Sequence, residues 1–566
     1  MIARRPIRRA VVLGALPAAL LVATVSGGQG CGRNSAVVTV QLLAINDFHG
    51  NLEPPLGRDG RIGETPAGGA EYLATHLKDD IARNSNSIVV AAGDLIGASP
   101  LISAFFHDEP TIESLSAMGL AVASVGNHEF DHGSKELLRL QNGGCHPTDG
   151  CQDGGSFAGA RFRYLSANVV SDQDQQSTTL FPPTAVRTIG GVKIGFIGET
   201  LKGTPRIVTP TSVQGLTFLD EAATANRYAA QLKQQGVNAI VLLIHQGGTQ
   251  YTDAQPNGCN DFRGDLIPIV SNLSADIKVV VSGHTHEFYN CTIDGHFVTS
   301  ASSYGRMITR IDLTIDPSTG TITSVAATND IVTRDVPKDP AQRQILAKYG
   351  PLSAPIANRV VGSVTGAITR AANAVGESAL GDLIADAQLA ATSPSVKGGA
   401  EVAFVNPGGI RADLSVNGGA VGTGARPVTY NDLFTIQPFS NVMTVMTLTG
   451  DMVKGVLEQQ FDNPSIGRHS FLQVSNGFAY RYRLSATPGQ RVDPMSIGVN
   501  GRVISPNEKV RVAVNNFLAA GGDGFTVLEQ GTNRIGGDLD IDAFVAYFKT
   551  HSPVSAGRQN RITKIN

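Results

Sequence analysis

Five apolar segments in the first three hundred residues each end in side chains that can bind a metal ion. One of them, residues 120–125, runs directly into Gly-Asn-His-Glu-Phe-Asp at residues 126–131. Short apolar segments bounded by glycine are typical of buried strands. In an open α/β sheet the carboxyl ends of the strands meet at one edge, where such folds build their sites. The segments end in Asp47 and His49, in Asp94, in Asn127 and His128, in His245, and in His284 with His286.

These strand ends carry a chemically consistent set of ligands. Carboxylate, imidazole and amide groups without a thiolate suit Mn, Zn, Fe or Mg better than a structural zinc site. With His128 set aside, the seven remaining side chains exceed what one tetrahedral ion needs. Two ions about 3.5–4 Å apart that share one carboxylate would use them all, and Asp94, alone at its strand end, is the natural bridge. Taken singly, each residue is more often a helix cap or a hydrogen-bonded polar side chain, so the hypothesis depends on the set.

Strand-like and helical patterns alternate along the chain, which predicts a largely α/β fold. Residues 297–333 alternate polar and apolar side chains with turns, as antiparallel strands do. The patterns predict strands at 36–46, 87–92, 121–125, 192–198, 239–244 and 277–281, and helices at 70–83, 111–118, 134–141, 222–235 and 267–273.

A change in composition near residue 334 indicates a second domain. Residues 335–352 place Pro, Lys, Asp and Gln around a helical pattern, so we expect a linker helix within 335–358. We therefore predict a larger domain at 36–334 and a smaller one at 359–566. In the smaller domain the patterns predict helices at 379–391, 430–436, 451–461 and 540–549, and strands at 401–405, 441–448, 473–485 and 509–514.

The N-terminus has the pattern of an export signal within residues 1–30. Four arginines precede an apolar stretch at 10–25, and small residues follow. The apolar stretch is short for a helix that would stay in the membrane. We therefore expect an exported protein that is periplasmic, attached to the cell surface or secreted. Cys31 lies just after this segment, where either a lipid anchor or an unpaired thiol would account for it.

Cysteine count and charge narrow the class of protein further. Of five cysteines, Cys145 and Cys151 share one glycine-rich loop, and Cys259 and Cys291 flank the segment with His284. In an exported chain we expect both pairs to form disulfides.

The formal net charge is −3, and the expected signal carries arginines but no acidic residue. A chain without a basic run is not expected to bind a nucleic-acid polymer, and a small anionic substrate would need locally placed cations.

The motifs together resemble a known family. Asn-Asp-Phe-His at 46–49, Gly-Asp at 93–94, the motif at 126–131, His245 and Gly-His-Thr-His at 283–286 resemble the blocks of calcineurin-like metallophosphoesterases. Later motifs resemble the C-terminal domain of the exported 5'-nucleotidase/UDP-sugar hydrolase family, namely Asn-Pro-Gly-Gly-Ile-Arg at 406–411, Gln-Pro-Phe-Ser-Asn at 437–441 and Gly-Gly-Asp-Gly-Phe at 521–525. The resemblance covers nearly the whole chain after the signal. It implies a β-sandwich flanked by helices, joined by a linker helix to a smaller α/β substrate-binding domain.

The resemblance also implies roles for the predicted ligands. One metal ion would be bound by Asp47, His49 and His286, and the other by Asn127, His245 and His284, with Asp94 between them. His128 would stabilise the transition state as a cation or protonate the leaving oxygen, and Asp131 would orient it. This agrees with the chemistry, because a neighbouring carboxylate raises the pKa of an imidazole. Phosphoryl transfer needs mainly positioning and neutralisation of oxygen charge, with a water made acidic by the metals as the nucleophile.

In the smaller domain the resemblance implies a nucleotide site. Asn406 and Arg411 flank a Gly-Gly turn, where arginine can bind phosphate through its planar fork. Phe439 and Phe517 would stack on the two faces of the base, and Asp523 would bind the ribose hydroxyls. Without the resemblance both phenylalanines would be assigned to the core, and Arg411 to a surface turn.

The chain departs from the family in one respect. The helix predicted at 379–391 has none of the arginines that family members generally place in the first helices of this domain, and Arg370 is the nearest. The choice between mono- and diphosphate substrates is therefore open.

We expect an exported hydrolase that uses two divalent metal ions (Zn, Mn or Mg) to remove phosphate from nucleotides, foremost 5'-nucleoside monophosphates. The alternatives are UDP-sugars, dinucleotides or 2',3'-cyclic nucleotides as substrates, a thiosulfate-ester hydrolase, or a non-catalytic surface binding protein. The expected site lies in the cleft between the domains, with the linker at 335–352 as a hinge. Base preference and oligomeric state stay open.

Overall fold

A computed structural model describes residues 37–172, 178–415, 424–464 and 467–565. The predicted export signal at 1–30 and Cys31 lie outside the described residues. The chain from Val37 onward packs as one compact unit. Within the described ranges, no helix is both long and apolar enough to cross a bilayer. The domain boundaries at 334 and 359 remain a prediction.

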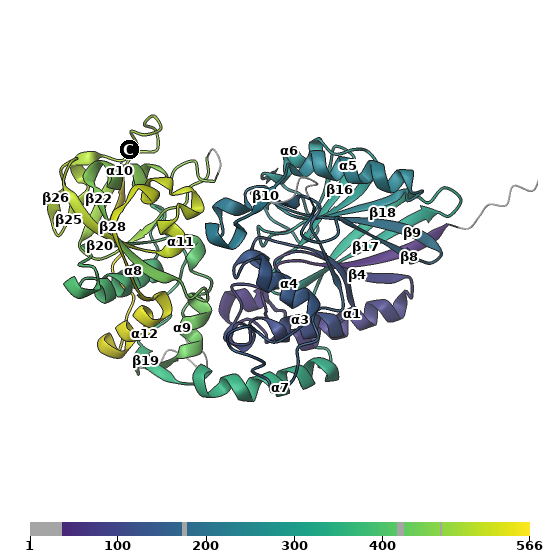
Figure 1. Cartoon of the computed structure of the whole chain (residues 1–566), viewed down its shortest axis with the longest axis horizontal. Helices are drawn as coiled ribbons and strands as arrows, with labels where there is room; N and C mark the ends of the chain where they lie inside the picture. Colours follow the sequence, from purple (N-terminus) through teal and green to yellow (C-terminus); the bar gives the residue numbers. More distant parts are fainter. Residues whose placement is uncertain (1–36, 173–177, 416–423, 465–466, 566) are drawn as a thin grey trace, which may run out of the picture. The chain divides into compact units, whose positions relative to one another are not determined.

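Two six-stranded sheets form the framework of the N-terminal half (Figure 1). The first has the order β18-β17-β1-β4-β5-β6 and the second the order β15-β16-β14-β11-β9-β8, with parallel pairing among β1, β4 and β5 and among β9, β11 and β14. The first sheet comprises β1 (Val38–Ile45), β4 (Ser87–Ala92), β5 (Leu120–Ser124), β6 (Arg163–Leu165), β17 (Met307–Asp316) and β18 (Thr321–Ile331). The second comprises β8 (Thr184–Ile189), β9 (Val192–Thr200), β11 (Ala239–His245), β14 (Ile277–Val281), β15 (Phe288–Ile293) and β16 (His296–Ala301).

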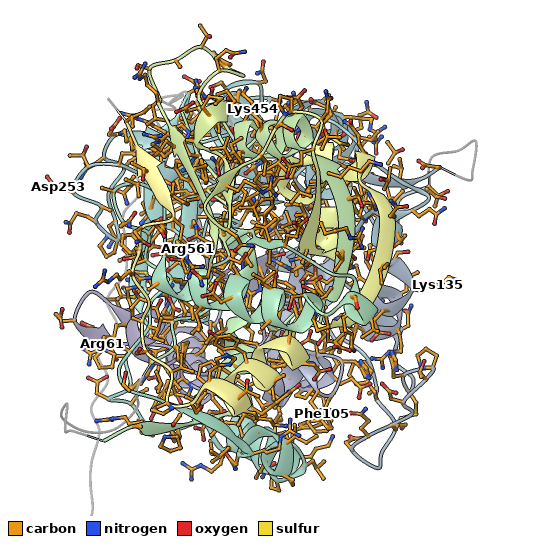
Figure 2. All side chains as sticks on the ribbon, turned by 90° about the vertical axis from the view of Figure 1, so that its left-hand side faces the viewer. Arg61, Phe105, Lys135, Asp253, Lys454 and Arg561 are labelled. Carbon is orange, nitrogen blue, oxygen red and sulfur yellow. A yellow bond between two sulfur atoms is a disulfide. The ribbon has the colours of Figure 1, made fainter. Side chains whose placement is uncertain are left out.

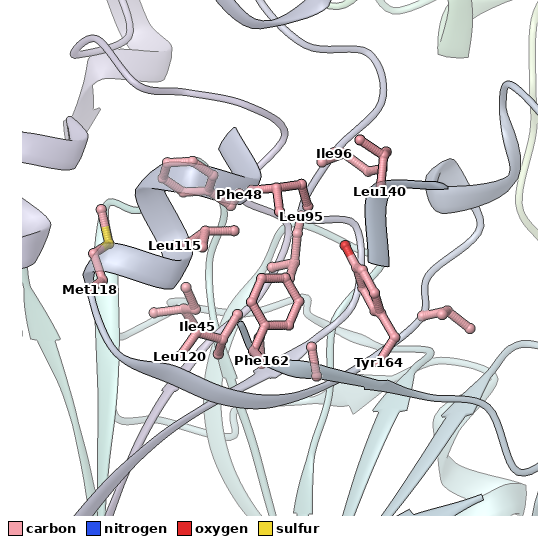
Figure 3. Close-up of a cluster of buried hydrophobic side chains, with 14 of the residues drawn as sticks. Ile45, Phe48, Leu95, Ile96, Leu115, Met118, Leu120, Leu140, Phe162 and Tyr164 are labelled. Atoms are coloured by element: carbon pink, nitrogen blue, oxygen red, sulfur yellow. The ribbon is translucent and has the colours of Figure 1, made fainter. Parts of the chain in front are cut away.

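The two sheets pack face to face, and helices cover their outer faces. Side chains alternate along β1, so Leu42 lies in the core between the sheets and Leu43 in the core beneath the helices. Figure 3 shows this outer core, where Leu115 and Leu140 pack over Phe162 and Tyr164. The first sheet is covered by α1 (Ala70–Arg83), α3 (Glu109–Ala117) and α4 (Ser134–Asn142), and the second by α5 (Glu221–Gln234) and α6 (Leu266–Ser271).

Helix α7 (Pro340–Ala357) follows β18 of the first sheet and leads to the C-terminal half of the chain. It begins after Asp339, whose side chain accepts hydrogen bonds from the backbone N–H groups of Ala341 and Gln342. Proline at the first helical position and aspartate before it are both favoured at a helix start. The linker helix predicted within 335–358 is thus present, from Pro340 to Ala357.

A five-stranded sheet, in the order β23-β20-β27-β22-β28, organises the C-terminal half. Phe404 and Val405 point to opposite faces of it and enter different apolar cores. Phe105, labelled in Figure 2, belongs to the N-terminal half but packs against the core that contains Val405. The strands are β20 (Val402–Val405), β22 (Val442–Thr449), β23 (Gln473–Val474), β27 (Lys509–Asn515) and β28 (Thr532–Leu539). The helices around it are α8 (Ala379–Thr392), α9 (Tyr430–Ile436), α10 (Gly450–Glu458) and α12 (Asp540–His551).

The α/β fold is confirmed, and the predicted helices and strands are present, most of them with ends close to those expected. The exception is the strand predicted at 473–485, which is two strands, β23 and β24 (Phe478–Tyr482), in different sheets. Both predicted disulfides, Cys145–Cys151 and Cys259–Cys291, are formed. The sequence patterns missed four edge strands of the three large sheets, β6, β8, β15 and β28. No residue of β8 or β28 is buried, so these two lack the apolar alternation by which a strand is predicted.

Candidate metal centre and substrate site

The carboxyl ends of strands from both sheets of the sandwich meet at one place. β1 leads to Asp47 and His49, β4 to Asp94, and β5 to Asn127, all from the first sheet. His245 ends β11, and His284 and His286 follow β14, all from the second sheet. The structure therefore brings together all seven side chains that the sequence predicts as ligands.

The backbone at these residues adopts an unusual conformation. Five of the seven have a positive φ, which costs a residue with a side chain about 1–3 kcal/mol. Such strain persists only where the surrounding structure enforces it, and it is concentrated at functional sites. The five φ angles are 49° at Asp47, 46° at His49, 49° at Asp94, 73° at His284 and 58° at His286.

Glycine makes the close approach of these loops possible. A Cβ atom at Gly126 would lie 2.2 Å from Asp94 Oδ1, and one at Gly93 would lie 2.8 Å from His245 Nδ1. Neither position has room for a larger residue, because the neighbouring atoms belong to the predicted ligands. Gly93, whose φ is 77°, is thus required by packing and by conformation, and Gly126 by packing.

The first group of ligands is formed by Asp47, His49 and His286. His49 Nε2 and His286 Nε2 lie 3.0 Å apart, and His286 Nε2 lies 3.4 Å from Asp47 Oδ1. His49 Nδ1 donates to the carbonyl of Gly97 at 2.8 Å. Because that nitrogen carries the proton, Nε2 of His49 presents its lone pair to the group.

The second group is formed by Asp94, His245 and His284, with Asn127 beside it. His245 Nε2 lies 3.0 Å from Asp94 Oδ2, and His284 Nδ1 lies 3.1 Å from Asn127 Oδ1. Asp94 Oδ2 also lies 3.7 Å from His49 Nε2 of the first group. Asp94 is thus the carboxylate that both groups share.

A buried nitrogen tests whether this arrangement fits a cation. His245 is fully buried, and its Nδ1 donates to the carbonyl of Ala92 at 2.8 Å. Its Nε2 has no hydrogen-bond partner, although it faces Asp94 Oδ2. A ring nitrogen that faces a carboxylate oxygen is favourable only where a positive charge lies between them, either a proton on the nitrogen or a cation in its place. The residues therefore fit a divalent cation at this point.

Burial shifts the pKa values of the ligands strongly. Burial raises the pKa of Asp47 to about 7 and, together with His245, lowers the pKa of His284 to about 3. Burial acts against the charged form of His245, but Asp94 outweighs it and raises that pKa to about 10. A bound cation would stabilise the ionised carboxylates and would compete with the proton on His245.

His128 lies at the mouth of the two groups and is not needed as a ligand. Its Nδ1 bonds Asp131 Oδ2 at 2.7 Å, and its backbone N–H donates to Asp94 Oδ1 at 2.9 Å. Burial acts to lower the pKa of His128, but the charges of Asp131 and Asp94 outweigh it, and the pKa is raised. The geometry therefore favours an imidazolium beside the metal groups, with Asp131 fixing its orientation.

Glu129 is a structural member of the site that the sequence analysis did not assign. Its buried carboxylate accepts backbone N–H bonds from Asp94 (2.9 Å), Leu95 (2.8 Å) and Gly126 (2.5 Å). It thereby fastens the loop after β4 to the loop after β5. Tyr164, whose hydroxyl is visible in Figure 3, donates to the same carboxylate at 3.4 Å. Only its position inside the motif at 126–131 could have indicated this role.

Tyr304 is a second residue that the sequence analysis missed. Its ring contacts two ligands edge-on, with centroids 5.9 Å from His49 and 5.3 Å from His286. Its backbone N–H donates to the carbonyl of Asp47 at 2.7 Å, and its φ is 61°. Tyr304 packs against the first group and limits the rotation of both imidazoles. No motif marked it in the sequence.

Among the predicted substrate residues of the C-terminal half, Asn406 forms two hydrogen bonds through its side chain. Asn406 Nδ2 donates to Asp523 Oδ2 at 2.7 Å, and Asn515 Nδ2 donates to Asn406 Oδ1 at 3.2 Å. Phe517 packs over Gly522, where a Cβ atom would lie 2.5 Å from its ring. In the described part of the chain, the rings of Phe439 and Phe517 do not contact one another.

Arg411 and Phe439 connect the substrate residues to the metal groups. The guanidinium of Arg411 lies 5.9 Å from the centroid of the Phe439 ring, which stacks on His128 at 5.7 Å. Nη2 of Arg411 is buried and has no hydrogen-bond partner. Arg370, in contrast, is engaged, because its guanidinium bonds both carboxylate oxygens of Asp59 at 2.9 Å. Both arginines line the same pocket, where Arg411 offers an anion an N–H group that has no protein partner.

Comparison with known proteins assigns this architecture. The family model for calcineurin-like phosphoesterases matches residues 40–288, and the model for the 5'-nucleotidase C-terminal domain matches residues 360–530. A cell wall protein of Listeria monocytogenes is 31% identical over 547 residues, which cover 90% of this chain and 67% of that protein. The chain belongs to the 5'-nucleotidase family. Members of this family are metal-dependent phosphoester hydrolases, and this chain is one of them.

Further relatives agree with the family. A 5'-nucleotidase precursor from Thermus thermophilus has a TM-score of 0.74 and 28% identity, over 94% of this chain and 100% of that structure. The snake venom 5'-nucleotidase of Naja atra is 25% identical over 92% of this chain and 98% of its own length. The endonuclease YhcR of Bacillus subtilis is 31% identical over 535 residues, but this chain spans only 41% of that protein.

Proposed function

We propose that this family member removes phosphate from 5'-nucleoside monophosphates. The main support for this proposal is that the ring of Phe439 stacks on the ring of His128, with 5.7 Å between centroids. An aromatic ring that could stack on a nucleobase thus lies beside the predicted acid of a phosphohydrolase centre. One surface can then hold a nucleotide base while its phosphate lies between Arg411 and the metal ligands. The NAD 5'-nucleotidase of Haemophilus influenzae, 24% identical to this chain, indicates that larger nucleotides are also substrates within the family.

Asp47, His49 and His286 would hold one divalent cation, and Asn127, His245 and His284 the other, with Asp94 shared. When bound, two such ions supply an acidic water as nucleophile and neutralise charge on the phosphoryl oxygens. Arg411 would orient the phosphate through its unpaired N–H group. His128, held as a cation by Asp131, would stabilise the charge on the leaving oxygen or transfer its proton to it.

The hydrogen bonds that Arg370 makes within the protein favour monophosphate over diphosphate substrates. Its bond to Asp59 and its bonds to the carbonyls of Ile410 and Arg411 use the guanidinium for structure. Arg411 is then left to bind a single terminal phosphate. Phe517 and Asp523 would complete the site by stacking on the other face of the base and by accepting from the ribose hydroxyls.

We also propose that the protein is exported. Two disulfides are favoured in an oxidising compartment, and the signal predicted at 1–30 would direct the chain there. Sequencing the N-terminus of the mature protein from separated cell fractions tests this. A mature chain in the cytoplasm that still begins at Met1 would contradict export.

Hydrolysis of a panel of substrates tests the reaction, with inorganic phosphate measured and the organic products separated by chromatography. The protein is treated with a chelator, and Mn, Zn or Mg is then added back with AMP, ATP, UDP-glucose, 2',3'-cyclic AMP or bis-p-nitrophenyl phosphate. We expect metal-dependent release that is highest with AMP. Faster cleavage of UDP-glucose would replace the monophosphate assignment with diphosphate hydrolysis. No hydrolysis of any of these substrates with any metal would contradict the catalytic assignment.

A further inference from the structure

A second cluster of metal-binding side chains lies outside the predicted catalytic centre. His107 occupies the turn between α2 (Leu101–Ala104) and α3, while His146 and Asp149 lie in the loop closed by the Cys145–Cys151 disulfide. None of these residues belongs to the motifs that identify the family. Their ligand atoms all lie within 4.8 Å of one another.

One carboxylate oxygen faces both imidazoles of this cluster. Asp149 Oδ2 lies 2.8 Å from His107 Nε2 and 3.5 Å from His146 Nδ1. The two rings are stacked, with centroids 3.6 Å apart and planes 11° apart. The side chains of His107 and His146 are 23% and 19% exposed, so the cluster is open to solvent on one side.

We propose that His107, His146 and Asp149 bind one divalent cation of borderline softness, such as Zn²⁺. Two imidazoles and one carboxylate are a ligand set that zinc uses, with water in the remaining position. The parallel rings must rotate about their side-chain bonds so that their nitrogen lone pairs converge on one ion. Their partial exposure gives them room to do so.

The surrounding backbone holds the ligands near this geometry. The disulfide joins the ends of the loop that carries His146 and Asp149, with a Cα–Cα distance of 4.7 Å. Within the loop the N–H of Gly150 donates to the carbonyl of His146 at 2.9 Å. The N–H of Asp149 donates to His146 Nδ1 at 3.3 Å, so this nitrogen carries a lone pair. A cation there would replace one long hydrogen bond.

The cation would join two segments that both pack against helix α7. Asp153, two residues beyond the disulfide, forms an ion pair with Lys348 at 2.6 Å. Next to His107, the ring of Phe106 contacts Tyr349 at 4.8 Å. Since α7 connects the regions matched by the two family models, the cation would stiffen the support of this connecting helix.

Metal content of the whole protein tests the proposal directly. Chelator-treated wild-type protein and His146→Gln are loaded with Zn²⁺, freed of unbound ion, and analysed for zinc per chain. We expect the variant to bind one ion fewer. The matched control is His551→Gln, which removes an exposed histidine stacked on Tyr547 (3.9 Å, 10°) and should bind as many ions as the wild type. Equal zinc content in His146→Gln and the wild type would overturn the proposal.

A measurement on wild-type protein avoids any effect of a substitution on folding. Diethyl pyrocarbonate modifies accessible histidines, and mass spectrometry locates the products. With Zn²⁺ we expect His107 and His146 to be protected, while His551 reacts as it does without the ion. Unchanged modification of His107 and His146 would contradict the site. Phosphatase activity of His146→Gln, assayed in parallel, separates this result from the assignment of the catalytic centre.

Discussion

The ring of Phe439 lies nearly parallel to the ring of His128, with 5.7 Å between centroids and 19° between planes. Phe439 comes from the C-terminal half of the chain and His128 from the end of β5. A substrate whose base stacks on Phe439 would therefore also lie close to His128. The two halves of the proposed reaction, recognition and phosphoryl transfer, meet at this pair.

Replacing Phe439 separates these two functions. We expect Phe439→Ala to raise KM for AMP by about tenfold or more, because stacking of a base on an aromatic ring contributes about 1–3 kcal/mol. p-Nitrophenyl phosphate has no nucleobase and serves as the control substrate. Steady-state kinetics with both substrates measure the difference. An equal rise in KM for both would contradict base stacking.

Replacing Asp94 and replacing His128 should have different effects on metal binding and activity. Asp94→Ala takes the shared carboxylate out of both ligand groups, so bound metal and activity should both be lost. His128→Ala leaves all seven proposed ligands in place, so metal content should be retained while kcat falls by about 10²–10⁴-fold, the usual contribution of acid–base catalysis. Metal analysis and kinetics on the same preparations check this. Full activity in Asp94→Ala would exclude the shared site.

The pH profile of kcat should report on Asp131. In the proposed mechanism His128 acts as a cation, so activity should be lost as pH rises through its pKa, which Asp131 helps to raise. Asp131→Asn removes that charge, lowers the pKa and should shift the alkaline limb of the profile to lower pH. Asp79→Asn, an exposed position on α1, is the control and should leave the limb unchanged. An unshifted limb in Asp131→Asn would show that another group sets it.

Replacing Glu129 should weaken folding and metal binding, because its carboxylate holds two loops in position. In Glu129→Gln an amide N–H₂ group replaces one of the oxygens that accept backbone N–H bonds from both loops. An unsatisfied buried donor costs about 1–3 kcal/mol, so the free energy of unfolding and the affinity for metal should both fall. Tyr164→Phe removes only a 3.4 Å bond to the same carboxylate and should have a smaller effect. Denaturant unfolding and metal titration measure the two quantities.

Asp540 should make stability depend on pH. Burial raises its pKa from 3.8 to about 7, so the folded protein binds the proton more tightly than the unfolded chain. The free energy of unfolding should therefore fall as pH rises from about 4 to about 7, by at most about 4 kcal/mol at roughly 1.36 kcal/mol per unit. Asp540→Asn should reduce this slope in denaturant unfolding measured across pH. The same slope in the variant would contradict the assignment.

Much of the fold and of the metal centre could be predicted because both are local in sequence. Strands such as β11 are nearly continuous apolar segments, and the ligand His245 ends that segment. The disulfide partners lie in one loop or beside one motif. What could not be predicted depends on contacts between distant segments. Tyr304 contacts His49 only because β16 and β1 end at the same place, and no local pattern encodes that.

The roles of the two arginines near the proposed substrate site also depend on contacts between distant segments. Arg370 is the arginine nearest in sequence to the expected phosphate clamp, but its guanidinium bonds Asp59, more than three hundred residues away. Conversely, Arg411 reads as a surface residue in a turn, but its Nη2 is buried beside Phe439. Which arginine keeps a free donor is decided by long-range pairing, and a single sequence does not contain that information.

The division of the ligands between two separate sheets has a consequence for the rest of the sandwich. Asp47, His49, Asp94 and Asn127 are fixed by the first sheet, and the three remaining histidines by the second. A small slip of one sheet over the other would pull the two halves of each ligand group apart. The geometry of the proposed metal centre therefore depends on how the two sheets are aligned. We therefore expect residues in the core between the sheets, such as Val241, to affect catalysis through the sheet alignment that they maintain.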